Sequence, residues 1–191
     1  MKQARILSSS EFKRVMAVID AHRYAERNRA IFQLSFRAGM RACEISSLRI
    51  ADVVDTEYIV KKEIVLEAHM TKGSERSRVI VSTALQKELQ RYVDAVCESK
   101  APNLPFVRSQ KGGFFSSLTI VQLFAKFYAK AGISGASSHS GRRQFITTLA
   151  ENQINMRVIQ ALARHRNMTT TARYIYVNDV KLQRAVEVVG F

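Results

Sequence analysis

The chain has 191 residues, of which 47% are hydrophobic, so it is long and apolar enough for one folded domain and does not have the composition of a disordered protein. No apolar run reaches the roughly 20 residues of a membrane span, and the N-terminus lacks the apolar stretch of a secretion signal, which predicts a cytoplasmic protein. Thirty basic residues and 16 acidic ones give a net charge of +14, which indicates a nucleic acid partner, with a merely basic surface as the alternative.

The first part of the chain has the pattern of three helices. Ser8 and Glu11 form a capping-box sequence, which predicts that a helix with an apolar inner side begins there. A second helix is expected over residues 27–38, and Gly39 would end it. A short third helix is expected over residues 41–48.

After these helices the β-branched residues become frequent, and the pattern changes to that of a small sheet. Short alternating runs at residues 64–69 and 78–81 flank a turn sequence at 71–74. We therefore expect a small three-stranded antiparallel β-sheet, with Lys72 near the tip of a hairpin. A further short extended piece is expected at residues 106–107.

The remainder of the chain is predicted to be helical. Because only two prolines and eight glycines interrupt the whole sequence, long helices should dominate. The helical periodicity covers residues 83–99, 117–131, 141–152, 156–163, 169–176 and 180–189. With no repeat or linker in the sequence, residues 1–191 are expected to form a single domain, mainly α with the small sheet (α+β).

The first candidate for chemistry is Arg41. It follows the break at Gly39 and opens a helix, where free backbone N–H groups already favour an anion. Taken alone, an arginine in a basic protein is more often a surface charge. Glu44 fits a helix cap as well as a partner that orients Arg41.

The second candidate is the pair His139 and Arg142 at the start of another predicted helix. Three nearby serines, Ser137, Ser138 and Ser140, can cap that helix. An imidazole and a guanidinium beside a helix N-terminus would form a phosphate pocket, although a lone histidine is more often structural.

The third candidate combines His165 with Tyr174, which follows nine residues later. Tyr176 is a rival nucleophile, but residues two apart on a helix do not share a face, so only one of the two tyrosines can serve. A zinc site is not indicated, because the four histidines lack helical i,i+4 spacing and neither Cys43 nor Cys97 accompanies them.

In chain order, Arg41, Lys72, His139-x-x-Arg142, His165 and Tyr174 resemble the motifs of the tyrosine recombinase (phage integrase) family. Those motifs are Gly-[Leu/Met]-Arg-x-x-Glu, a hairpin lysine, His-x-x-Arg, and Gly-His followed nine residues later by tyrosine. The resemblance covers about residues 8–186. It implies the fold of a tyrosine recombinase catalytic domain.

The resemblance also implies a role for each matched residue. Tyr174 would attack a DNA phosphate and form a 3′-phosphotyrosine link, while Arg41, Arg142 and His165 would hold the phosphate oxygens. The roles are completed by proton transfer, for which the resemblance implies Lys72 as the acid that protonates the leaving 5′ oxygen and His139 as the proton acceptor for Tyr174. No cofactor, metal or ATP is implied.

Two residues depart from the family pattern. Arg164 stands where a glycine often precedes the second histidine, and it would have to accept strain, end the helix differently, or supply another phosphate contact. Gly141 replaces a leucine in the His-x-x-Arg motif.

The domain organisation departs from most of the family as well. Most members carry an N-terminal core-binding domain, and many add an arm-binding domain, whereas the catalytic pattern here begins near residue 8. We expect a single catalytic domain without either, which is a short recombinase or a fragment of a longer one.

The function expected from the resemblance is site-specific DNA recombination, in integration, excision or inversion. A type IB topoisomerase and a non-catalytic DNA-binding relative are the alternatives. The expected partner is double-stranded DNA, bound at the nucleoid by a protein that is a monomer in solution and a tetramer on two sites, with a possible accessory DNA-bending protein. An apolar stripe near the C-terminus, at Leu182, Val186 and Val189, would dock on the protein's own core or on a neighbouring subunit.

Overall fold

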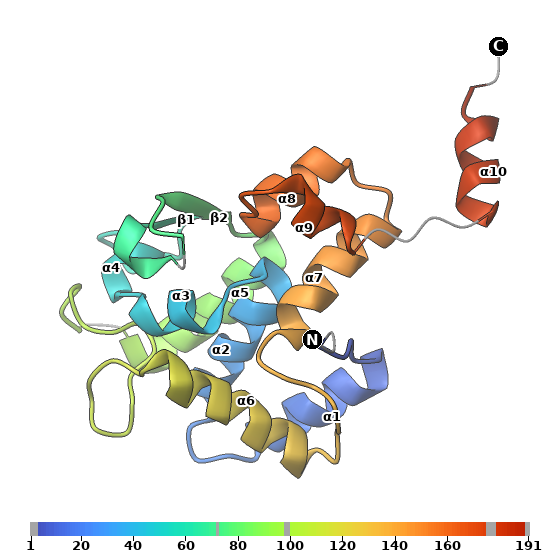
Figure 1. Ribbon diagram of the computed structural model, residues 1–191. Coiled ribbons are helices and arrows are strands. Elements are labelled where there is room, and N and C mark those ends of the chain that lie inside the picture. Colours follow the sequence, from blue (N-terminus) through green and yellow to red (C-terminus); the bar gives the residue numbers. More distant parts are fainter. Residues whose placement is uncertain (1–3, 72, 98–99, 175–178, 190–191) are drawn as a thin grey trace.

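The computed structural model describes residues 4–71, 73–97, 100–174 and 179–189 (Figure 1). Its first half contains α1 (Ser9–Asp20), α2 (Ala25–Ala38), α3 (Ala42–Ser47) and α4 (Ile50–Val53). The capping box is confirmed, since the Ser8 hydroxyl accepts from the Glu11 N–H and the Glu11 carboxylate accepts from the Ser8 N–H. The expected end of α2 at Gly39 is confirmed too.

The sheet has two strands rather than the three that the sequence predicted. Strands β1 (Glu63–Leu66) and β2 (Ser77–Ile80) pair antiparallel. The 3₁₀ turn η1 (Ala68–Met70) follows β1, so the first strand ends earlier than expected. The extended piece at residues 106–107 adds no strand. Pro105, which precedes it, forms one isolated antiparallel bridge with Arg49, and the Phe106 N–H donates to the Leu48 carbonyl.

The second half contains most of the remaining helices in the order expected. The elements are α5 (Thr83–Tyr92), the π-helical turn η2 (Val93–Cys97), α6 (Ser117–Lys130), α7 (Ser140–Glu151), α8 (Met156–Ala163), α9 (Met168–Ala172) and α10 (Asp179–Glu187). The helix predicted over residues 169–176 is shorter than expected, since α9 ends at Ala172 and residues 175–178 lie outside the described part of the chain.

Helix α2 lies in the middle of the domain, with α1, α5 and α7 packed around it (Figure 1). Its Phe32 is fully buried and meets aromatic rings of α6, among them Phe124 at a centroid distance of 4.3 Å. A second, smaller core lies between α7 and α8 and consists of Ile146, Ala150, Ile159 and Ala163. The main core therefore supports α2 and α3, and the smaller core joins α7 to α8.

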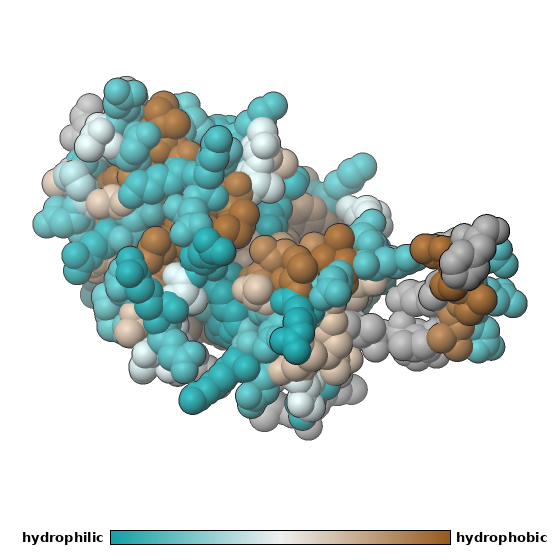
Figure 2. Space-filling model, turned by 90° about the horizontal axis from the view of Figure 1, so that it is seen from above, coloured by the Kyte–Doolittle hydropathy of each residue, from teal (hydrophilic) through white to brown (hydrophobic). Residues whose placement is uncertain are grey.

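Helix α10 stands away from the rest of the domain (Figure 1). Its apolar residues Leu182, Val186 and Val189 are exposed, and they form an apolar patch set apart from a mostly hydrophilic surface (Figure 2). The stripe is therefore not docked on the chain's own core in this structure. In the described ranges, no helix has both the length and the apolar character that a membrane crossing requires.

Candidate active site

Five of the six predicted site residues line one cavity of about 520 Å³: Arg41, His139, Arg142, His165 and Tyr174. Arg41 lies at the N-terminus of α3, and His139 and Arg142 lie at the N-terminus of α7. His165 precedes α9 in the chain, and Tyr174 follows it. The sixth, Lys72, lies outside the described residues. Its neighbours Thr71 and Gly73 line an adjoining cavity of about 360 Å³, which shares Arg41 and His165 with the first.

Arg41 is placed by the turn that separates α2 from α3. Gly39 has a φ of 59°, and a Cβ atom there would lie 2.7 Å from the ring of Phe145, so both the backbone and the packing require glycine. After the turn, Glu44 accepts from the Arg41 backbone N–H at 2.9 Å and from its guanidinium at 2.6 Å. The sequence left capping and orientation as alternatives for Glu44, and the structure combines them.

Arg142 lies in the first turn of α7 and is buried. Its guanidinium donates to the Gly39 carbonyl at 2.6 Å and to the Ala163 carbonyl, so it joins the α2–α3 turn to the end of α8. Burial, with the nearby charges of Arg41 and Arg164, lowers the pKa of Arg142 to about 9. The guanidinium therefore stays charged at neutral pH.

Gly141, the departure from the family's leucine, has a packing reason. Helix α7 lies so close to α2 that a Cβ atom at Gly141 would meet the Ser35 hydroxyl and lie 2.7 Å from the ring of Phe36. The glycine brings the backbone before Arg142 against α2.

Arg164 ends α8 in a left-handed conformation, with φ 54° and ψ 48°. Its side chain is only 5% exposed and forms an ion pair of 2.8 Å with Glu44. It also donates to the carbonyls of Ala38 and Gly39, at 3.3 and 3.1 Å. The sequence allowed strain, a different helix end, or a phosphate contact at Arg164. The structure has the strained left-handed helix end, and the guanidinium binds protein groups.

The carboxylate of Glu44 and the guanidiniums of Arg41, Arg142 and Arg164 form one charged cluster with an excess of two positive charges. Burial is the largest influence on the pKa of Glu44 and would raise it, but Arg164, Arg41 and a backbone N–H outweigh burial and lower this pKa. Arg41 is the least buried of the three arginines and faces the cavity. Such a surplus of partly desolvated positive charge favours an anion in the cavity.

His165 follows Arg164 and lines both cavities. Its Nδ1 lies 2.9 Å from the hydroxyl of Thr171, and its ring stacks on Tyr174 at a centroid distance of 6.1 Å. Burial first, and then the charges of the arginine cluster, lower the pKa of His165 to about 4. The imidazole of the free protein is therefore neutral at pH 7.

Tyr174 comes directly after α9 and packs against the smaller core. His139 is exposed at the N-terminus of α7 and lines the same cavity. Tyr176 lies outside the described residues, so the preference for Tyr174 over Tyr176 stays a prediction.

Two residues that sequence reasoning did not assign contribute to the site. Thr171 is fully buried and contacts His165. Arg143 lines the cavity and donates to the Ala4 carbonyl at 2.5 Å, which brings the N-terminal segment to the cavity wall. The sequence does not show which of the three consecutive threonines 169–171 is buried at the site. Arg143 was not singled out because the family motif assigns the adjacent Arg142.

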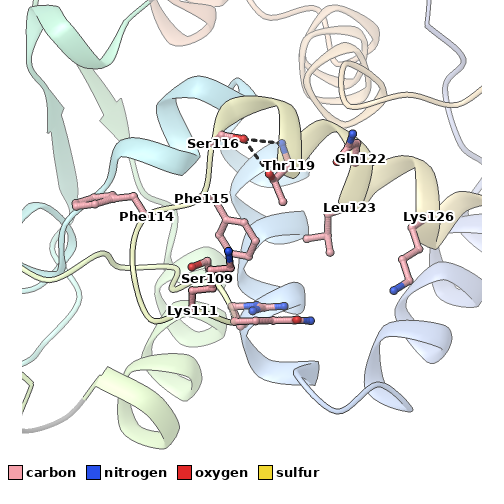
Figure 3. A pocket seen from close by; sticks show the side chains of 11 residues that line it. Ser109, Lys111, Phe114, Phe115, Ser116, Thr119, Gln122, Leu123 and Lys126 are labelled. Atoms are coloured by element: carbon pink, nitrogen blue, oxygen red, sulfur yellow. Dashed lines mark hydrogen bonds between the residues drawn. The ribbon is translucent and has the colours of Figure 1, made fainter.

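A separate pocket lies beside α6 and the loop before it, where Ser116 caps the helix by accepting from the Thr119 N–H at 3.1 Å (Figure 3). Arg27 forms part of its wall, with its guanidinium 5.0 Å from the centre of the Phe115 ring. None of the predicted site residues that the structure describes lines this pocket.

The chain belongs to the phage integrase family, whose model matches residues 5–181. A tyrosine recombinase XerA of Pyrococcus horikoshii is 28% identical over 186 residues, which cover 95% of this chain and 60% of the relative. A tyrosine recombinase XerC of Lactobacillus delbrueckii subsp. bulgaricus is 30% identical over 161 residues, covering 80% of this chain and 51% of the relative. The chain thus spans between half and two thirds of these relatives.

Solved structures share the fold. A crystal structure of XerA recombinase superposes with a TM-score of 0.75 and 24% identity, covering 100% of this chain and 65% of that one. A Tn1549 transposon integrase, solved with a circular intermediate DNA, has a TM-score of 0.79 and 16% identity, covering 99% of this chain and 67% of that one. The predicted fold class, a mainly helical tyrosine recombinase catalytic domain with a small antiparallel sheet, is confirmed.

Proposed function

We propose that this chain is the catalytic domain of a site-specific DNA recombinase, which cuts and rejoins DNA through a phosphotyrosine intermediate on Tyr174. The observation that carries the proposal is the convergence of Arg41, His139, Arg142, His165 and Tyr174 on one cavity beside a buried surplus of positive charge. The catalytic set is completed by Lys72 in the proposal, on the basis of the family resemblance.

In the proposed cleavage step the phenol oxygen of Tyr174 attacks a DNA phosphorus. A bond from this oxygen to phosphorus forms while the bond from phosphorus to the 5′ oxygen breaks. A phenol becomes a strong nucleophile only when it gives up its proton, so Tyr174 needs a proton acceptor, and His139 is an exposed imidazole in the same cavity. Lys72 protonates the leaving 5′ oxygen, and rejoining reverses these transfers.

The arginines act on the charge that develops at phosphorus. Arg41 and Arg142 bind the non-bridging oxygens, which carry an additional negative charge in the transition state. Because both guanidiniums are already fixed by protein contacts, little reorganisation is needed when that charge appears. Loss of one such preorganised donor typically slows a reaction about 10²- to 10³-fold.

The substrate in this proposal is double-stranded DNA. The net charge of +14 supports it, and so do the relatives, since the Tn1549 integrase and a XerH recombinase were solved in complex with DNA. A DNA substrate places the protein in the cytoplasm, on the nucleoid when it is bound. Residues 1–191 would act as one catalytic domain in this proposal.

Assembly is a further part of the proposal. We expect a monomer in solution and a tetramer on two DNA sites, with an accessory DNA-bending protein where the sites must be brought together. The exposed stripe of α10 supports this, because helix α10 stands off the domain and offers an apolar face to a neighbour. Deleting the residues after Asp179 should spare DNA binding and abolish strand exchange, and retained strand exchange would rule out this role.

The test is covalent trapping on a pool of nicked duplexes with randomised sequence, from which the cleaved strand end diffuses away. Wild type and Tyr176→Phe should form a protein–DNA adduct that survives denaturation, and Tyr174→Phe should form none. Peptide mass spectrometry locates the adduct. An adduct on Tyr174→Phe, or none on wild type, would overturn the proposal, and rapid relaxation of any supercoiled plasmid would favour a topoisomerase instead.

A further inference from the structure

The buried hydroxyl of Thr171 forms a hydrogen bond with Nδ1 of His165. We propose that Thr171 is a positioning residue that keeps His165 in the tautomer with its proton on Nε2, so that the ring donates to a DNA phosphate. This inference rests on the proposed function for its purpose, but the tautomer itself is a property of the free protein.

The contact between Thr171 and His165 lies where α9 packs on α8. Thr171 lies in α9, which packs on α8, and its side chain is 0% exposed. His165 is fixed by its backbone as well, because its N–H donates to the Gln160 carbonyl at 3.1 Å and its carbonyl accepts from the Gln160 side chain at 3.1 Å. The distance of 2.9 Å between Nδ1 and Oγ1 is thus set by the turn that holds His165 after α8 and by the packing of α9.

The direction of the hydrogen bond follows from burial. Among the described residues, His165 is the single hydrogen-bond partner of the Thr171 hydroxyl. If Nδ1 carried the proton and donated it, the hydroxyl proton would be left buried without an acceptor, at a cost of about 1–3 kcal/mol. If the hydroxyl donates instead, Nδ1 is the acceptor and neither group is left unpaired.

With Nδ1 as the acceptor, the ring proton of the neutral imidazole resides on Nε2. Burial, and then the charges of Arg142, Arg41 and Arg164, keep the pKa of His165 low, so the imidazole of the free protein carries this single proton at neutral pH. A phosphate oxygen then meets an N–H donor. In the other tautomer it would meet a lone pair, which repels it.

A threonine can also serve a site by filling space alone, and substitutions separate the two roles. Thr171→Val keeps the branched shape and removes the hydroxyl, whereas Thr171→Ser keeps the hydroxyl and removes a methyl group. Thr169→Val is the matched control, because Thr169 lies in the same helix and is exposed.

The experiment combines single-turnover cleavage of a nicked duplex with ¹⁵N NMR of the histidine side chains in the free protein. The spectrum of wild type should show the Nε2–H tautomer at His165, and that of Thr171→Val a mixture of the two. Cleavage by Thr171→Val should slow by about 10- to 100-fold at unchanged DNA affinity. This is the loss typical of removing the partner that hydrogen-bonds the second ring nitrogen of a metal-bound histidine. Thr171→Ser and Thr169→Val should cleave at close to the wild-type rate.

Three outcomes would overturn the inference: a wild-type spectrum with the proton on Nδ1, full cleavage by Thr171→Val, or equal losses in Thr171→Val and Thr171→Ser. The wild-type spectrum decides the hydrogen-bond direction even if a variant does not fold. Failure of wild type to trap DNA strikes the proposed function instead, so the two failures are distinguishable.

Discussion

Glu44 and Arg164 form an ion pair of 2.8 Å in which both side chains are buried. The same carboxylate binds Arg41, so Arg164 is linked through Glu44 to the arginine that faces the cavity. A glycine at position 164, common in the family, would lack this link. The geometry of Arg41 in this chain therefore depends on a side chain that closes α8.

Replacing Arg164 with glycine sets two effects against each other. The left-handed backbone would be relieved of about 1–2 kcal/mol of strain. The lost hydrogen bonds to a charged partner are worth about 1.5–3 kcal/mol each, so we expect the free energy of unfolding to fall. Trapping should also slow, because Glu44 is left with Arg41 alone. Urea unfolding and single-turnover cleavage measure the two effects, and a variant as stable and as active as wild type would contradict this account.

Glu44→Gln should lower stability in a pH-dependent way. The pKa of Glu44 is lower in the folded protein than its ordinary value of 4.5, so the carboxylate adds stability above that pH and the contribution is lost as pH falls through the folded pKa. Wild type should thus exceed Glu44→Gln in unfolding free energy most at neutral pH, by about 3–5 kcal/mol for a broken buried pair, and least in acid. A difference that is constant from pH 7 to pH 3 would count against the assignment.

His165 gives a second pH dependence. Its pKa falls from 6.5 to about 4 on folding, so the unfolded chain binds more protons between these values. Stability should decline as pH drops from 6.5 towards 4, and His165→Asn should lose this part of the decline. NMR titration of the free protein checks the cause directly, and a His165 pKa at or above 6.5 would refute it.

Gly39→Ala should damage both fold and site. A left-handed backbone costs a non-glycine residue about 1–2 kcal/mol, and the ring of Phe145 must also move. Because Arg142 and Arg164 both donate to the Gly39 carbonyl, cleavage should fall as well. Gly113→Ala is the control, since a Cβ atom at Gly113 meets nothing within 4 Å. Equal thermal stability of the two variants would argue against the prediction.

The helices and the order of the site residues could be predicted because they rest on local patterns. Ser8 and Glu11 mark a helix start by their own chemistry, and Gly39 marks an end. The spacing from His165 to Tyr174 places both beside α9, on a scale that the sequence displays directly.

Other features depend on contacts between distant segments and could not be predicted. Arg164 is 120 positions from Glu44 in the chain, and no local pattern indicates that their side chains meet. The number of strands depends on such contacts as well, because an extended segment becomes a strand only where a partner segment lies opposite it. The segment at Pro105 meets Arg49 in one isolated bridge. The role of Thr171 could not be predicted for another reason: Thr171 is only six positions from His165, but the sequence does not show which side chain of α9 turns towards the imidazole.

The division of the hydrophobic interior into two cores has a consequence for control. Arg41 directly precedes α3, in which Ile45 belongs to the larger core, whereas Tyr174 packs against the smaller core between α7 and α8. Small clusters open locally at lower free energy than large ones, so hydrogen exchange should be faster in α8 and α9 than in α2. A local opening would then move Tyr174 away from Arg41 while the domain stays folded. Under the proposed function, activity could therefore be lost without loss of the fold.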